Sequence, residues 1–273
     1  MKPVTDINLM LLMMSFIILL LPIAFLLYYK IKLVTSILVS VLRMVIQLSL
    51  VAVYLEWVFD KNSVWINSLW VFVMIWVGIF TTIRRASLSY RVFIIPLFIS
   101  GFTSIFIVDA FFLGIILRLD YVFDAQYFIP ITGMILGNAL NHNIIGLRTY
   151  YKELAEKPDL YQFLLTNTGS LQQAIRPFVA EAVKQALNPL IASMSVMGLI
   201  SLPGMMTGQL LGGSAPVIAI KYQIMIMIAI FAGCSLNLFI SILVTRKFAF
   251  DEYSNLKSPY VFQGNTEKHI KQI

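Results

Sequence analysis

Two polar side chains that could line a transport path interrupt an apolar segment at about 33–57. Arg43 and Gln47 lie four positions apart, so they share one face of a helix. An ionisable side chain in hydrocarbon costs at least about 2.5 kcal/mol, so Arg43 needs a polar partner or a wet cavity. Either the pair lines a path for an anionic solute, or Arg43 reaches back to the membrane interface, and the pattern favours neither.

A second polar group ends the apolar segment at about 126–146. Asn138, Asn141 and His142 are spaced to share one helix face. Hydrogen bonds between packed membrane helices are their favoured role. A metal or proton site at His142 has weak support, because no Cys, Asp or Glu stands at ligand spacing from it.

A weak point is predicted inside a later apolar segment, at about 189–211. Pro203 removes a backbone hydrogen bond and clashes with the preceding turn, so the helix should kink or break there, beside Gly204. Gln209 and Gln223 are polar candidates near the outer end of this region. We expect the translocation path or its gate to be formed by Arg43, Gln47, Asn138, Pro203, Gly204, Gln209 and Gln223.

The segment from Leu171 to Leu187 is amphipathic. Its apolar residues recur at helical spacing, and the opposite face carries Gln172, Gln173, Arg176 and Glu181. Such a helix could couple a cytoplasmic partner to the membrane path. A helix that merely lies among lipid headgroups fits the pattern equally well.

Motifs for catalysis are missing from the chain. G-x-x-x-x-G-K-[ST], H-E-x-x-H and G-x-S-x-G do not occur, so ATP binding by a P-loop is excluded. The single Cys234 allows no cysteine-based metal cluster, and Asp109 is the only acid placed to serve a proton-coupled carrier. The 13 methionines are scattered, which favours apolar filling over soft-metal binding. We expect neither an enzyme nor a cofactor in this chain.

The elements that position these residues must be membrane helices. Of the 273 residues, 59% are hydrophobic and 12% are charged, whereas soluble domains carry about 25% charged residues. Apolar runs of about 20 residues fit helices that cross a bilayer and exclude a barrel of short strands. The net charge of +7 is explained by loop charges that fix orientation, so no nucleic-acid partner is expected. The fold class is therefore an all-α polytopic membrane protein.

About seven spans are expected, in a transmembrane domain over 1–246 with a coupling loop at about 147–188 and a tail at 247–273. Most Lys and Arg residues fall on one set of loops, which should face the cytoplasm together with the tail and the C-terminus. The N-terminus is then outside, on the side that carries only Lys2, Lys61, Arg118 and Lys221. The expected spans are roughly 7–28, 33–57, 64–82, 92–117, 126–146, 189–211 and 217–245.

One run, from Val196 to Gly213, contains Leu-Pro-Gly-Met-Met-Thr-Gly-Gln and resembles the FetB-type ABC permease family. That family includes bacterial iron-export permeases and plant aluminium-tolerance permeases. The resemblance covers nearly the whole chain, and the run is a specific motif. Further matches are Leu42-Arg43 with Gln47-Leu48, and Pro130-x-x-Gly133-Met134 with Gly137-Asn138.

The resemblance implies a permease subunit in the inner (plasma) membrane, paired as a homodimer with a separate ATPase that binds ATP and Mg. It implies export of a metal ion such as iron, and a part in metal or oxidative-stress resistance. Plant relatives point instead to a nucleotide sugar such as UDP-glucose, and an ion-gradient-driven carrier is a further alternative. The family's coupling segment places the ATPase contact between Gly169 and Gln185, and so at Gly169, Gln172, Gln173, Arg176 and Glu181. No metal ligand follows from the resemblance.

Overall fold

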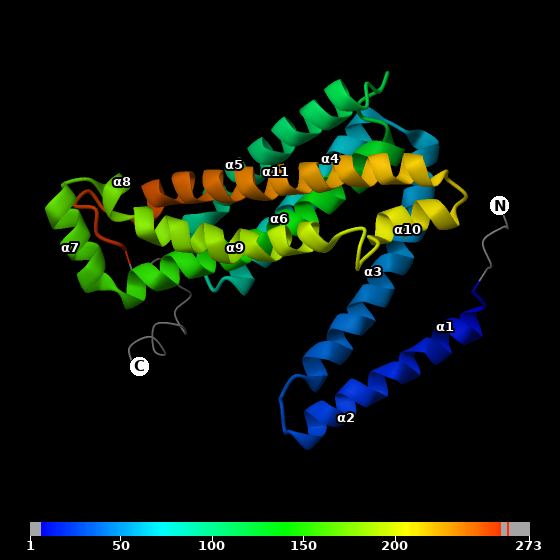
Figure 1. Cartoon of the computed structure of the whole chain (residues 1–273), viewed down its shortest axis with the longest axis horizontal. Helices are drawn as coiled ribbons and strands as arrows, with labels where there is room; N and C mark the ends of the chain where they lie inside the picture. Colours follow the sequence, from blue (N-terminus) through cyan, green and yellow to red (C-terminus); the bar gives the residue numbers. More distant parts are fainter. Residues whose placement is uncertain (1–6, 258–260, 262–273) are drawn as a thin grey trace.

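The chain folds into a bundle of long helices, with an arm of helices at the N-terminus that stands apart (Figure 1). The computed structural model describes residues 7–257 and residue 261, and these contain helices and no strand. The polytopic all-α membrane fold expected from composition is confirmed. The bundle consists of α4 (Val64–Arg85), α5 (Tyr90–Asp109), α6 (Ala125–Glu156), α9 (Arg176–Val196) and α11 (Pro216–Ala249).

Close helix packing in the bundle depends on glycines that face neighbouring helices. A Cβ added at Gly146 of α6 would lie 2.5 Å from Leu238 Cδ1 of α11 and 3.3 Å from Ala186 Cβ of α9. A Cβ at Gly233 of α11 would lie 2.5 Å from Ile135 Cγ2 of α6. Small residues let helix backbones approach in a membrane, where van der Waals packing drives association. The three helices are therefore fixed against one another at these points.

A buried polar network joins α5, α6 and α11. Asn143 Nδ2 donates to Asn237 Oδ1 at 2.7 Å and to Ser241 Oγ at 3.1 Å. Ser241 Oγ donates in turn to Ser100 Oγ at 2.8 Å. All four side chains are buried, so these hydrogen bonds form away from water and hold the register of the three helices.

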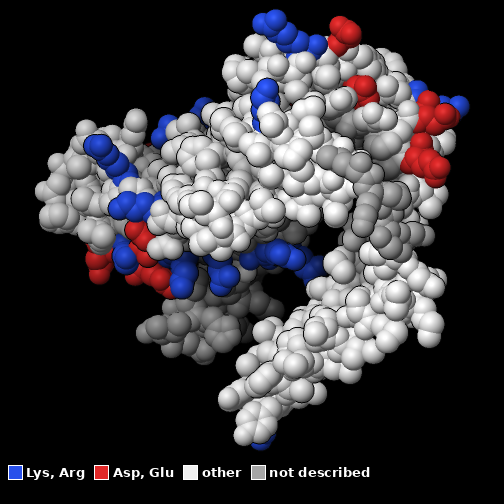
Figure 2. Space-filling model, turned by 45° about the vertical axis from the view of Figure 1, so that its right-hand side comes forward, with Lys and Arg blue, Asp and Glu red and all other residues white. Residues whose placement is uncertain are grey.

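The N-terminal arm consists of α1 (Leu9–Ser15), the 3-10 turn η1 (Phe16–Leu19), α2 (Leu20–Tyr28) and α3 (Val34–Lys61). The arm has two strongly apolar stretches, one within Leu9–Tyr28 and one within Val34–Lys61, and no residue of either stretch is buried inside the chain. Only the far end of α3 packs on the bundle, where Val58 is fully buried. Figure 2 shows a hollow between this white arm and the bundle, bordered by Lys and Arg side chains.

Short elements connect the long ones. The π-helical turn η2 (Ala110–Ile116) continues α5, and α7 (Pro158–Thr168) begins with proline at a first-turn position. It ends at Gly169, whose φ of 62° favours glycine. Two further helices are α8 (Leu171–Ala174) and α10 (Gly204–Leu211).

Among the described residues, five stretches are long and apolar enough to cross a membrane. The expected spans that start at 126 and at 189 are not among them. Their helices, α6 and α9, carry more polar residues. Seven crossings and the orientation of the two termini stay predictions. The five stretches are Leu9–Tyr28, Val34–Lys61, Val64–Arg85, Tyr90–Ile116 and Pro216–Ala249.

The region around 171–211 differs most from expectation. The segment 171–187 is not a separate surface helix, because α9 begins at Arg176 and runs through Pro189 to Val196 without interruption. Its 21 residues span ~31 Å, about the thickness of a bilayer core. The expected span 189–211 is therefore divided, with its first third in α9 and its last third in α10. Burial of Phe178, Ala182 and Ala186 in the bundle explains why the amphipathic stretch is part of the core.

Candidate functional site

The helix interruption expected at Pro203 is present, and it is longer than a kink. Residues 197–203 are not helical, and Gly198 has a φ of 84°, a conformation that favours glycine. The Gly198 N–H donates to the carbonyl of Ser201 at 2.9 Å and closes a tight turn. Pro203 caps α10, and its carbonyl accepts from the backbone N–H of Thr207 at 3.0 Å. Within a bilayer, a non-helical backbone is tolerated where it lines a cavity or is covered by protein.

A cavity of about 520 Å³ lies against this break, between α9, α10 and α11. Gln223 of α11 reaches into it with 6% of its surface exposed. Its amide Nε2 donates to Met197 Sδ at 3.8 Å, while its Oε1 is buried without a donor among the described residues. The methionines that line the same cavity are Met194, Met197, Met206 and Met227.

This donor set has a definite chemistry. Thioether sulfur is a soft ligand that suits transition-metal cations better than Mg²⁺ or Ca²⁺, whereas the amide oxygen is a hard ligand that either group of cations can take. The prediction of scattered filler methionines missed this grouping. The helical spacing of Gln223 and Met227, four residues apart on α11, was a signal that could have found part of it.

The other expected path residues are not brought to this cavity. Gln209 lies on α10, half-buried, with its Oε1 lacking a donor in the described part of the chain. Asn138 donates from Nδ2 to the carbonyl of Met134 on its own helix at 2.8 Å. Gly204 starts α10 and adjoins the break. Thus Pro203 and Gln223 line the cavity, Gly204 lies beside it, and Asn138 does not take part.

The last two expected path residues, Arg43 and Gln47, lie on α3 in the N-terminal arm. Arg43 is exposed and makes no hydrogen bond or ion pair with any described residue. Gln47 lines a groove of about 480 Å³ between α3, α4 and α6, whose wall includes Gly133 and Gly137. No described residue is therefore the polar partner that a charge in a span requires.

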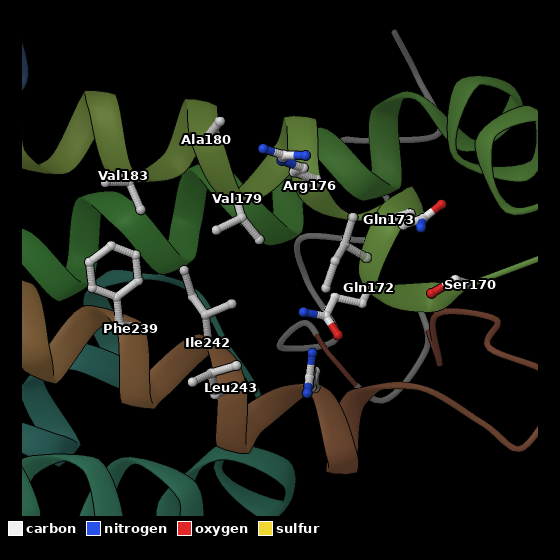
Figure 3. A pocket seen from close by; sticks show the side chains of 12 residues that line it. Ser170, Gln172, Gln173, Arg176, Val179, Ala180, Val183, Phe239, Ile242 and Leu243 are labelled. Atoms are coloured by element: carbon white, nitrogen blue, oxygen red, sulfur yellow. The ribbon is translucent and has the colours of Figure 1, made fainter. Parts of the chain in front are cut away.

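Another groove, distinct from the cavity at the helix break, lies where α8 and α9 meet the C-terminal part of α11. It has a volume of about 840 Å³. Figure 3 shows Ser170, Gln172, Gln173 and Arg176 at one end and Phe239 at the other. This groove, which we call the basic groove, also holds Arg246 of α11, so two guanidinium groups and two amides border its polar end.

Two expected coupling residues lie outside the basic groove. Gly169 ends α7, one residue before the groove wall begins at Ser170. The Glu181 carboxylate accepts from Gln185 Nε2 at 2.8 Å along α9. The polar end of the groove is therefore formed by the exposed Gln172, Gln173 and Arg176.

Asn138, Asn141 and His142, near the end of the fifth expected span, do not all share one helix face as expected. His142 Nδ1 lies 2.6 Å from the carbonyl of Asn138, and Cys234 Sγ lies 3.6 Å from the same nitrogen. Asn141 is exposed, so it does not join the face of the other two. The expected helix-to-helix hydrogen bonding is therefore present at His142, which contacts Cys234 of α11, and the stronger bonds to α11 come from Asn143, which was not predicted. Within the described residues, no group of three or more His, Cys, Asp or Glu could hold a metal.

Comparison with known proteins gives a consistent picture. Residues 9–250 match the model of a family described as an uncharacterised protein family, UPF0014. The chain is 29% identical to the UPF0014 membrane protein YjkA of Bacillus subtilis, over 80% of this chain and 86% of the relative. It is 32% identical to the probable iron export permease protein FetB of Escherichia coli, over 80% and 83%.

A plant relative is also similar. Identity to the protein ALUMINUM SENSITIVE 3 of Arabidopsis thaliana is 32%, over 69% of this chain and 67% of the relative. No solved structure gives a significant match. The family match covers the bundle, the arm and the helix break, so this multi-pass membrane protein belongs to the UPF0014 family.

Proposed function

We propose that the chain is the permease subunit of an ATP-driven ABC transporter that exports a transition-metal cation such as iron. Family membership supports a membrane permease, and the name of the Escherichia coli relative points to iron export. The observation that carries the proposal is the cavity at the helix break, with Gln223 and four methionines in its wall. Export of this kind would contribute to metal or oxidative-stress resistance.

The cavity supports cation handling because its ligands can exchange. Gln223 Oε1 is buried without a donor, so an incoming cation would meet an oxygen that has no bond to give up. The thioethers around it are neutral and polarizable, so they bind a metal cation without trapping it by charge. The break at 197–203 provides a segment that can change conformation as the cation passes.

Energy for export would come from a separate ATPase, because the chain lacks a P-loop. The basic groove is the proposed contact. Its polar end, at Gln172, Gln173 and Arg176, is exposed, and it connects through α9 to the helix break. A displacement of this end of α9 by the ATPase would therefore be transmitted along one rigid helix to the cavity. ATP and Mg would be bound by the partner and not by this chain.

A second permease chain is the proposed partner for the arm. Arg43 and Gln47 are exposed on α3, and neither hydrogen-bonds within the described residues. Packing of two copies through α3 would let these side chains find polar partners inside a larger bundle. A homodimer with two ATPases is the resulting assembly.

One observation favours a rival, a secondary carrier driven by an ion gradient. Asp109 is a carboxyl group buried among membrane helices, a common feature of proton-coupled carriers. Transport by the isolated chain in vesicles, insensitive to vanadate, would favour that rival over the ABC permease.

The test is metal efflux from cells that express the chain with its ATPase. Gln223→Leu keeps the side-chain volume and removes the amide, so export of radioactive iron should fall at least about tenfold. The matched control is Gln126→Leu, an exposed glutamine at the start of α6. Unchanged export by the Gln223 variant would refute the cavity as part of the path.

A further inference from the structure

A buried acid at the end of α5 has no role in the proposed metal path. Asp109 is 5% exposed and lies between two apolar stretches of the same membrane segment. Its Oδ2 accepts from Thr132 Oγ1 of α6 at 2.6 Å. Its Oδ1 is buried and has no hydrogen-bond partner among the described residues.

The described chain leaves the ionised form of this carboxyl without a counter-ion. An ionised Asp109 would need a cation, and no ion pair to it is formed there. A protonated Asp109 can donate its O–H from Oδ2 to Thr132 Oγ1, which still leaves Oδ1 buried without a donor among the described residues. An unpaired acid in hydrocarbon is costly and usually marks a functional site. A cation that pairs with the ionised carboxylate would have to come from outside the described chain.

Asp109 lies in the wall of a groove of about 400 Å³ between α4, α5 and the start of α6. It is the one charged residue of that wall, and Thr132 holds its carboxyl from α6. Aromatic rings form much of the rest, because the groove is also lined by Phe72, Phe102, Phe106, Phe123 and Phe128.

The rings are arranged in ordered pairs. Phe102 and Phe106, one helical turn apart on α5, are stacked with centroids 6.3 Å apart. Phe123 and Phe128 meet edge to face at 5.3 Å. Phe102 and Phe106 are exposed on a membrane helix, so the groove opens toward the bilayer. The π-helical turn η2 starts directly after Asp109, and such turns are frequent at functional sites.

This composition selects one class of ligand. A metal ion wants several oxygen ligands, whereas the side chains of the groove wall offer the Asp109 carboxylate and the Ser68 hydroxyl. A large organic cation needs a single counter-ion and apolar walls, and aromatic rings attract cations. The volume also lies in the range of small-molecule pockets, which are mostly apolar with a few placed polar groups.

We propose that this groove binds a lipophilic organic cation, an ammonium or phosphonium compound with aryl or alkyl substituents, with Asp109 as its counter-ion. The Asp109 carboxylate pairs with the charged centre, and the phenylalanine rings contact the substituents. Thr132 holds the carboxylate in place. The ligand enters from the bilayer, past Phe102 and Phe106. This binding site is independent of the metal path and does not rest on it.

The experiment measures binding of tetraphenylphosphonium to the full chain in detergent micelles by equilibrium dialysis, with empty micelles subtracted. Wild-type protein should bind saturably, and Asp109→Asn should weaken binding at least about tenfold because the charge pair is lost. Asp120→Asn, which removes an exposed acid from the adjoining loop, should bind like wild type. The neutral triphenylphosphine oxide should bind at least about tenfold more weakly than the cation.

A second pair of variants keeps the test decisive if Asp109→Asn does not fold. Phe102→Ala and Phe106→Ala change exposed side chains and leave the buried carboxyl intact. Each should weaken binding at least about threefold, through lost ring contacts. Equal binding by the neutral compound, or unchanged affinity in the Asp109 variant or in both phenylalanine variants, would overturn the proposal.

Discussion

At the scale of single residues, polar side chains in this protein divide by what they contact. Asn143 donates two hydrogen bonds to α11, whereas Asn138 bonds within its own helix and Asn141 is exposed. The three asparagines are close in sequence and differ only in the helix face they occupy. Position around the helix, rather than residue type, therefore decides which of them holds the bundle together.

Asn143→Ala should destabilise the protein by about 1–2 kcal/mol, because Asn237 Oδ1 and Ser241 Oγ each lose one buried hydrogen bond. Thermal unfolding in detergent, followed by circular dichroism, measures the loss. Asn141→Ala on the same helix should change stability by less than about 0.5 kcal/mol. Equal effects of the two substitutions would show that the network contributes nothing.

At the scale of elements, α6 is the helix on which the bundle is built. It packs on α4, α9 and α11, and its glycines decide how closely. Gly146 faces Leu238 and Ala186 at distances that exclude a side chain, while a Cβ at Gly137 would meet no atom within 4 Å. The two glycines thus have different roles on one helix.

Gly146→Val should cost about 1–3 kcal/mol, because the new side chain overlaps fully buried neighbours. Gly137→Val is the matched control and should be tolerated much better, since nothing stands in its way. Yield of monodisperse protein and the midpoint of thermal unfolding report the difference. If valine is equally harmless at both positions, α6 and α11 are not as close as described.

At the scale of the whole molecule, the charges divide the bundle into two ends. The helix ends near α7 and α8 carry Arg84, Arg85, Lys152, Lys157 and Lys247, whereas the opposite end carries Lys61 and Arg118. The basic groove lies at the first end, and the methionine-lined cavity lies toward the second. An ATPase bound at the basic groove would therefore act on a cavity near the opposite end of the bundle, where the cation would be released.

The positive-inside rule predicts that Lys152 faces the cytoplasm and Lys61 the exterior. A membrane-impermeant maleimide added to intact cells should label Lys61→Cys, and should label Lys152→Cys only after permeabilisation. The native Cys234 is buried and adds no background. The reversed pattern would place the basic groove outside, beyond the reach of a cytosolic ATPase.

Much of this protein follows from its sequence alone. Apolar length and sparse charge determine that the chain is a bundle of membrane helices, because hydrocarbon leaves the backbone few other ways to satisfy its hydrogen bonds. The interruption at Pro203 was also predicted, since proline lacks the N–H that a helix requires. Proline alone does not fix a break, because Pro96, Pro130 and Pro189 lie inside continuous helices.

Only the tertiary structure decides which residues meet. The amphipathic stretch at 171–187 has an apolar face that a headgroup layer or a helix bundle could bury, and packing against α6 places it in the core. The grouping of Met194, Met206 and Gln223 joins residues from three helices, and the approach of Asp109 to Thr132 joins two. Such contacts depend on helix rotation and crossing, which are set by close packing between elements and leave no periodic signal in the chain.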